Sequence, residues 1–501
     1  MGRGTVQGTA ALVAAGLLAS CAVGPDFAVP PAPDVPGYTP ERLAPATAAA
    51  ATRGGGAQRF VKDLDLPGQW WVLFRSKPLN MLVEKALAAN QDLKAAQAAL
   101  RVARENVRAQ QGMLLPSVDL GTSAFRGRPQ LGGPLDNSVQ TPTFNLFTTQ
   151  LSISYVPDVF GGTRRSIEAL VAQEDQQRFQ LEATYLTLTS NLAGAAVQEA
   201  NLRGQIAATQ RIIKVERDTL GLMRKQRQAG QIAEADVVAQ EAALAQVEQT
   251  LPPLQKQLAQ ERDLIAALIG GFPSDRLPVE FRLAGLRLPR DLPLSIPAKL
   301  IEQRPDVRMA EENLHAASAQ IGVAIANRLP NITLTGTAGS TSDAINTMFG
   351  SGTQFWGVTA AATQPIFHGG TLFHREQAAK AAFDQALAQY RSTVITAFQN
   401  VADSLRAIQM DAVTLQKAVA SERAAARSLE IVRGRLKLGD VNYLALLNAQ
   451  QTYQQAVIAL VQAQAARYAD TVALFQALGG GWWNRQDVEA EKPTTIGDFF
   501  Q

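Results

Sequence analysis

One cysteine and three histidines are the residues best suited to nucleophilic, redox or metal chemistry in this chain of 501 residues. A lone Cys21 cannot form an intrachain disulfide or a multi-thiolate metal site. His368 and His374 are six positions apart and therefore do not share one face of a helix, and His315 is the third histidine. The sequence has no HExxH, GxSxG or P-loop pattern. We therefore expect no catalytic residue, no metal and no cofactor.

Cys21 instead fits a covalent lipid attachment site. Single cysteines are usually small buried hydrophobic residues, and that reading stays open. However, the run "AALVAAGLLAS" before Cys21 is too short to span a bilayer and has the length of a signal-peptide core. The tetrapeptide "LASC" is similar to a bacterial lipobox, which implies that residues 1–20 are a lipoprotein signal peptide and that Cys21 carries lipid. Ala22 stands where an inner-membrane retention signal has aspartate, so outer-membrane sorting is favoured.

Composition favours long helices that pack closely. Apolar residues make up 46% of the chain but aromatic residues only 6%, and alanine and glutamine are abundant. The formal net charge is +3 and the basic residues are dispersed, so nothing indicates a nucleic-acid partner. After the signal core no run of eighteen apolar residues remains. A crossing of the membrane would therefore not use hydrophobic helices.

The chain contains one long sequence repeat. "QDLKAAQAALRVARENV" from Gln91 matches "PDVRMAEENLHAASAQI" from Pro305, and "YVPDVFGGT" from Tyr155 matches "TQPIFHGGT" from Thr363. The matching stretches lie about 210 residues apart, which indicates one duplicated unit rather than a solenoid. Each half has the order helix, strand, loop, strand, very long helix, glycine break, helix.

The first part of each half predicts a helix and then a strand pair. The first helix spans about Leu79 to Gln111 and its partner about Pro305 to Asn327. The strand pairs are "PSVDLGTSAF" with "TTQLSISYV" and "PNITLTGTAGS" with "FWGVTAAATQPIF". Segments of about ten residues with alternating faces are typical of transmembrane β-strands. Two surface hairpins are the alternative.

Each strand pair precedes a very long helix. The chain lacks proline from Asp158 to Leu251 and from Ile366 to Lys492, and apolar residues recur there at alternating steps of four and three. About 65 residues of helix would span about 100 Å. Gly230 and Gly439 are expected to end these helices with left-handed backbone. Return helices, "EADVVAQEAALAQVEQTL" and "YLALLNAQQTYQQAVIALVQAQAARYADTVALFQAL", then make two antiparallel hairpins with their tips at the two glycines.

Four strands cannot close a barrel, and an open sheet edge in lipid leaves backbone groups without partners. Closure therefore requires several copies of the chain. Three copies give twelve strands, within the range of outer-membrane barrels, whereas two give eight strands and a plugged lumen. The fold class expected is mainly α with transmembrane β, in which long helices continue a β-barrel as a helical cylinder.

The sequence resembles the TolC-like outer-membrane efflux channels, in particular the lipoprotein branch that works with resistance-nodulation-division pumps. The resemblance rests on "CAVGPDF", "WWVLFRSKPLNMLVEKALAANQDL", "RPDVRMAEENLHAASAQIGVA", "LPNITLTG" and "PIFHGGT". It implies a homotrimer with a twelve-stranded barrel in the outer membrane and a periplasmic α-helical barrel gated at its helix tips. It also implies a periplasmic adaptor (membrane fusion protein) and an inner-membrane pump as partners, with the trimer as a passive exit duct for drugs or other small molecules.

The same resemblance assigns roles at the second tip, "LGDVNYLALLNAQ". Leu444 matches the position of an apolar constriction ring, although a coiled-coil core position is the alternative. Asn448 stands where the family often has aspartate, and Ala445 stands where another acidic residue can occur. The carboxylate ring of the family is therefore not expected here, and cation block at the tip should be weak.

At the first tip, Asp236 follows Gly230 by six residues and matches an aspartate that links adjacent hairpins in the family. Val441 replaces the basic partner that some members have. Gly230 and Gly439 complete the predicted tip.

The repeat and the resemblance divide the chain into six predicted segments. They are a signal peptide at 1–20, a lipidated extended or equatorial segment at 21–78, repeat 1 at 79–271, an inter-repeat equatorial segment at 272–304, repeat 2 at 305–478 and a C-terminal tail at 479–501. A soluble periplasmic coiled coil, such as an adaptor subunit, would explain the heptads but not two hairpins placed identically before them.

Overall fold

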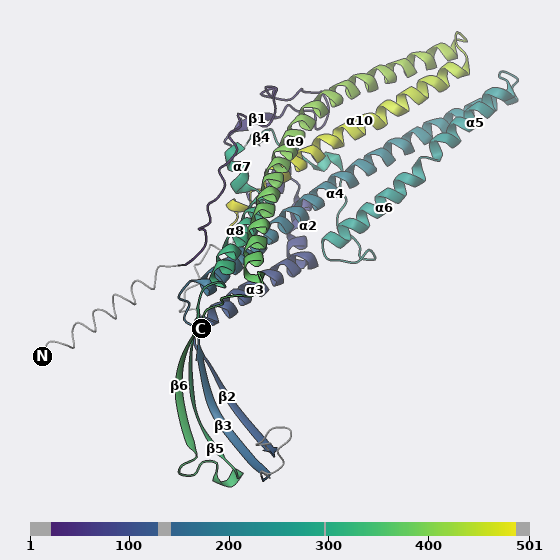
Figure 1. Ribbon diagram of the computed structural model, residues 1–501. Coiled ribbons are helices and arrows are strands. Elements are labelled where there is room, and N and C mark those ends of the chain that lie inside the picture. The colour runs from purple at the N-terminus through teal and green to yellow at the C-terminus, as the bar shows by residue number, and fades with distance from the viewer. Residues whose placement is uncertain (1–21, 129–141, 295–296, 487–501) are drawn as a thin grey trace.

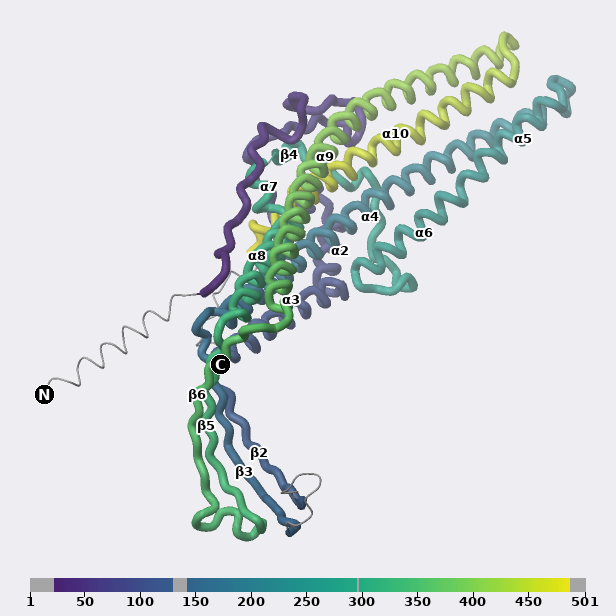
Figure 2. The backbone as a smooth tube through the Cα atoms, viewed as in Figure 1, coloured from purple at the N-terminus to yellow at the C-terminus, as the bar shows by residue number. Residues whose placement is uncertain are grey.

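The computed structural model describes residues 22–128, 142–294 and 297–486. The molecule is elongated, with a four-stranded sheet at one end and two long helical hairpins that reach away from it (Figure 1). The two halves of the chain contribute alike, because each sends two strands into the sheet and one long helix away from it (Figure 2). The duplication seen in the sequence is therefore a duplication of structure.

The sheet is antiparallel with the order β2-β3-β5-β6. Its strands are β2 (Ser117–Gly127), β3 (Phe144–Tyr155), β5 (Asn331–Ser342) and β6 (Gln354–Thr363). The central β3–β5 pair joins the two halves of the chain. Within the described residues, β2 and β6 each have one edge without a neighbouring strand.

The two faces of this sheet differ in polarity. One row of the register crosses all four strands through Leu120, Leu151, Ala338 and Trp356. The adjacent row, on the opposite face, crosses them through Asp119, Ser152, Thr337 and Gly357. Leu120 is 72% exposed and Trp356 is 81% exposed. An exposed apolar face backed by a polar face suits a sheet with lipid on one side and water on the other.

The two long helices are α4 (Gly162–Gln228) and α9 (Thr371–Lys437), each of 67 residues. A helix of that length spans about 100 Å, as predicted. Many of the apolar residues that recur at steps of four and three along these helices, among them Leu192, Leu202 and Leu405, are buried. None of the helices in the described ranges combines the length and the apolar character needed to cross a bilayer.

The return helices differ between the halves. α10 (Tyr443–Ala477) is continuous and packs against α9. In the first half, α5 (Glu234–Glu248) is followed by a separate α6 (Leu251–Leu268). The predicted return helix, Glu234–Leu251, matches α5 to within three residues, whereas the separate helix α6 was not predicted. The two prolines after Leu251 occupy the first turn of α6, where their missing N–H groups cost nothing.

The helix predicted from Leu79 to Gln111 is also two helices, α2 (Lys77–Ala89) and α3 (Gln91–Gly112). Asn90 separates them with extended backbone, and its side-chain oxygen accepts a hydrogen bond of 3.0 Å from the Leu93 N–H. Asparagine at such a position starts a new helix rather than continuing the old one. The matching helix α8 (Pro305–Ala326) is unbroken, as predicted.

The main core lies around the middle of the molecule, where loops from three parts of the chain cover the helices. Strand β1 (Arg59–Lys62) pairs in parallel with β4 (Asp291–Leu294), and the 3₁₀ helix η1 (Trp70–Phe74) packs into the core with Phe475. The short helix α7 (Pro297–Gln303) follows β4, and its last carbonyl accepts a 2.8 Å hydrogen bond from the Trp482 indole. The N-terminal, inter-repeat and C-terminal segments thus meet in one collar, here called the equatorial collar.

Candidate functional site

The two hairpin tips have the same backbone geometry. Gly230 has φ +72° and Gly439 has φ +79°, so both adopt the left-handed conformation expected from the sequence. The Gln231 N–H donates to the Gln226 carbonyl at 2.9 Å, and the Asp440 N–H donates to the Arg435 carbonyl at 3.0 Å. These bonds close the helix ends in the same Schellman-type turn.

Tyr443 links the two tips within one chain. It stands in the first turn of α10, and its hydroxyl donates to the Gln226 side chain on α4. Its ring packs against the cluster of Leu220, Met223 and Val237 in the first hairpin and against the cluster around Leu446 in the second. No motif or spacing in the sequence marked Tyr443 as a site residue. A tyrosine at the start of the second return helix was the available clue.

Asp236 lies in the first turn of α5, close to Tyr443. Burial and, to a lesser degree, the Asp236 charge raise the pKa of the Tyr443 hydroxyl. No ion pair to Asp236 occurs within the described part of the chain, and Val441 at the facing tip offers none. The Asp236 charge is thus near enough to Tyr443 to affect its hydroxyl, although the two residues belong to different hairpins.

Leu444 and Asn448 lie along a groove between the first and second hairpins. The groove has a volume of about 1140 Å³ and is bordered by α4, α5, α6 and α10. Leu444 is 60% exposed, whereas Leu446 is 4% exposed and occupies the core position. Leu444 is thus available to contact something outside its own hairpin. Ala445 is only half-buried, and its N–H donates a hydrogen bond of 3.1 Å to Oδ1 of Asn442.

A buried polar group, Glu216, lies at the back of the same groove. It is 4% exposed and accepts a hydrogen bond from the Gln240 side chain on α5. Burial raises the pKa of Glu216, while Gln240 and the Arg433 charge oppose the rise. The side chain of Gln450 on α10 is buried beside the groove and has no hydrogen-bond partner among the described residues. A carboxylate at a heptad core position was the clue in the sequence.

The three histidines do not come together. His315 lies 3.2 Å from Glu168 and 3.4 Å from Glu312, and its ring stacks on Phe27 with 4.4 Å between centroids. His368 lies before α9, and His374 lies in its first turn. His315 thus braces the N-terminal segment against two helices.

Cys21 lies outside the described residues, but the residues that follow it are placed. The Val23 N–H donates to the Phe160 carbonyl at 3.1 Å, at the junction between β3 and α4. Arg165 is buried and binds Asp26 at 2.7 Å. From Val23 the described part of the chain therefore runs from the junction of sheet and helices to the equatorial collar (Figure 1).

Comparisons with known proteins agree with this architecture. The family model described as outer membrane efflux protein matches residues 82–271 and 296–480. The pyoverdine export outer membrane protein OpmQ of Pseudomonas putida is 30% identical over 434 residues, which cover 86% of this chain and 90% of that protein. Outer membrane protein OprJ of Pseudomonas aeruginosa is 29% identical over 485 residues, covering 95% and 96%.

Solved structures show the same fold. The outer-membrane channel OprN has a TM-score of 0.80 at 29% identity and covers 92% of this chain and 100% of that one. The MtrE outer membrane channel of Neisseria gonorrhoeae, in its open state, has a TM-score of 0.77 at 26% identity, covering 94% and 100%.

The two-faced sheet and the paired helical hairpins define an outer-membrane channel whose helices extend into the periplasm. The chain belongs to the outer membrane efflux protein family, whose fold is TolC-like. Its relatives are transport proteins rather than enzymes, and the protein serves efflux across the outer membrane.

Proposed function

We propose that three copies of this chain form a gated exit duct in a tripartite efflux system. The sheet carries the proposal: it has two open edges, one apolar face and one polar face, and it leads directly into helices of 67 residues. Backbone groups at an open edge are costly in lipid. Copies of the chain that pair β2 of one with β6 of the next satisfy those edges, and twelve strands leave a water-filled lumen.

The gate of this duct is proposed at the hairpin tips. Leu444 forms the apolar ring at the narrowest point, and Asn448 replaces a ring of carboxylates. Gly230 and Gly439 shape the tips, and Asp236 and Tyr443 hold the hairpins together. The exposure of Leu444 and the two-sided packing of Tyr443 support this assignment.

The partners proposed are a periplasmic adaptor of the membrane fusion type and an inner-membrane pump of the resistance-nodulation-division class. The exported compounds are drugs or other small molecules, and no cofactor takes part. Lipid on Cys21 provides a second hold on the membrane, which the position of Val23 at the sheet–helix junction supports.

The direct test is purification from outer membranes in detergent, followed by native mass measurement and planar-bilayer recording. We expect a heat-modifiable trimer that conducts ions. A soluble periplasmic monomer without conductance would contradict the proposal and favour an adaptor-like coiled coil. Genes for an adaptor and a pump beside the gene for this protein are expected, and export in a channel-deficient strain should require both.

A further inference from the structure

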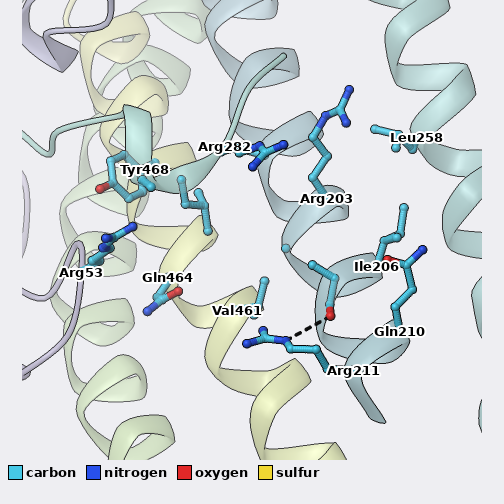
Figure 3. A pocket seen from close by; sticks show the side chains of 15 residues that line it. Arg53, Arg203, Ile206, Gln210, Arg211, Leu258, Arg282, Val461, Gln464 and Tyr468 are labelled. Atoms are coloured by element: carbon cyan, nitrogen blue, oxygen red, sulfur yellow. Dashed lines mark hydrogen bonds between the residues drawn. The ribbon is translucent and has the colours of Figure 1, made fainter. Parts of the chain in front are cut away.

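We propose that a pocket beside the equatorial collar binds a small soluble anion with two or more phosphate or carboxylate groups. The pocket has a volume of about 540 Å³, within the range of small-molecule sites. Figure 3 shows four arginine side chains around it, which come from three different parts of the chain. This inference concerns a site away from the tip and the sheet, and it does not depend on the proposed gate.

The arginines come from separate elements. Arg203 and Arg211 belong to α4, Arg282 belongs to the inter-repeat segment, and Arg53 belongs to the N-terminal segment (Figure 3). Gln464 and Tyr468 on α10 complete the polar wall. Arg203 and Arg211 share one helix, and Arg53 and Arg282 join them from two other parts of the chain, so four like charges repel one another here and attract an anion.

The carboxylates nearby compensate only some of these charges. Arg203 pairs with Glu199 at 2.8 Å and with Glu280 at 3.4 Å, and Arg282 reaches the same Glu280 at 3.5 Å. Glu280 and Arg282 are largely exposed, so this pair is weak and can rearrange. Glu199 also forms an ion pair of 2.9 Å with Arg262, so its one negative charge is shared between two arginines.

Two arginines have no carboxylate partner within the described residues. Arg211 donates only to the backbone carbonyl of Ala207, at 3.2 Å, and Arg53 has no hydrogen bond or ion pair there. Guanidinium groups bind phosphate and carboxylate through paired hydrogen bonds and stay charged at every physiological pH. Arg53 and Arg211 are therefore the groups that an anion would engage first.

The floor of the pocket is built rather than incidental. The α4 and α10 helices meet at Gly204, where an added Cβ would lie 2.8 Å from the Val461 side chain. Gln464 is held by its hydrogen bond of 2.8 Å to Thr52, next to Arg53. The Tyr468 hydroxyl is held by the Leu286 carbonyl at 3.2 Å. The pocket thus lies at a fixed contact between the two hairpins.

Position selects a soluble anion over a lipid headgroup. At a rise of about 1.5 Å per residue, Arg203 lies about 60 Å along α4 from the end of the helix that joins the sheet. A headgroup at the membrane surface does not reach that far. An anion in this pocket would connect α4, α10 and two collar segments, and it would stabilise the assembly by mass action.

The test is isothermal titration calorimetry on the detergent-purified full chain, with inorganic pyrophosphate and citrate as separate probes at constant ionic strength. We expect one site per chain, with affinity lowered at least about tenfold in Arg211→Gln and in Arg53→Gln, because each loses a charged hydrogen-bonding group. Arg101→Gln, an exposed arginine of α3, is the matched control and should bind as the parent does.

Several outcomes would overturn the proposal. Binding that is equally strong in the parent and in the Arg53→Gln/Arg211→Gln double variant would place the anion elsewhere, and so would no binding of either probe by the parent. Phosphatidate micelles that displace pyrophosphate would assign the site to lipid. Arg211→Lys keeps the charge and should recover part of the affinity, and an unchanged melting temperature distinguishes lost binding from lost folding.

Discussion

Leu444 shows why a residue's exposure matters more than its type at the hairpin tip. It sits two positions before a buried leucine of the same helix, yet most of its surface is free. We expect Leu444→Ser to raise single-channel conductance, because a polar side chain admits water to an apolar constriction. Planar-bilayer recording measures the change. Leu264→Ser, an exposed leucine of α6 far from the tip, should leave conductance as it is.

Unchanged conductance and unchanged antibiotic leakage in Leu444→Ser would remove this residue from the gate. The constriction would then have to be sought elsewhere along the groove, for example at Leu447.

Asn448 tests the missing carboxylate ring. In a trimer, Asn448→Asp would bring three carboxylates toward the axis, and divalent cations bind such oxygen-rich sites. We expect added Mg²⁺ or Ca²⁺ to reduce the conductance of Asn448→Asp but not that of the parent or of Asn448→Gln. A variant that conducts equally with and without metal would show that Asn448 does not face the lumen.

At the scale of elements, the contact between α9 and α10 contains a pair of acidic side chains. Burial, and then a hydrogen bond and charge from Asp470, raise the pKa of Asp411 to about 7, against the opposing charge of Arg467. The folded protein therefore holds a proton that the unfolded chain releases, so stability should rise as pH falls from about 7 toward 4.

Asp411→Asn should remove this dependence. The measurement is the melting temperature of the purified protein at pH 5 and pH 8, where the difference should shrink in Asp411→Asn. Asp403→Asn, at an exposed site on the same helix, is the control and should keep the parental difference. Equal pH dependence in the parent and Asp411→Asn would show that other groups govern it.

The sheet gives a second prediction at this scale. Leu120 lies on the apolar face, and arginine near the middle of a membrane strand costs about 2–4 kcal/mol. Leu120→Arg should therefore lower the yield of assembled protein in outer membranes, whereas Thr337→Arg, on the polar face, should assemble. Quantitative immunoblots of membrane fractions compare them. Equal yields would mean that lipid does not contact this face.

At the scale of the whole molecule, the proposed lipid on Cys21 and the sheet would attach the protein to the same membrane in two independent ways. We expect Cys21→Ser, supplied with a cleavable signal peptide, to remain a trimer that conducts ions, because strands in a closed barrel are enough to hold the protein in the outer membrane. Sedimentation and bilayer recording test this. A soluble monomer would show that the lipid anchor matters more than the strands and would require a different architecture.

Local patterns predicted most of the elements but few of the contacts between them. Heptad spacing, missing prolines and two glycines were enough for both hairpins, since these features act over a few residues. Asn90 broke a helix that periodicity alone continued. The collar was harder to predict, because Arg467 binds the carbonyls of Gly54 and Gly56 from the other end of the chain.

The tip was predicted in part. Gly230 and Gly439 follow from backbone chemistry, while Tyr443 and Glu216 depend on how one hairpin leans on the other. No spacing rule within either hairpin encodes that contact. The arginine pocket was missed for the same reason, since its four members are scattered along the sequence and only the fold brings them together.

The pairing of β3 with β5 sets an order of events during biogenesis. Thr148 and Thr341 face each other across that pair although 193 residues separate them. The four-stranded sheet therefore cannot be completed until most of the polypeptide has been delivered, because each half alone supplies only one two-stranded hairpin. In the proposed trimer the outer edges close last and only by collision between chains. The rate of trimer formation should therefore rise with the concentration of unassembled chains. Until they assemble, the exposed edge strands of folded chains must be kept from pairing with the wrong partner.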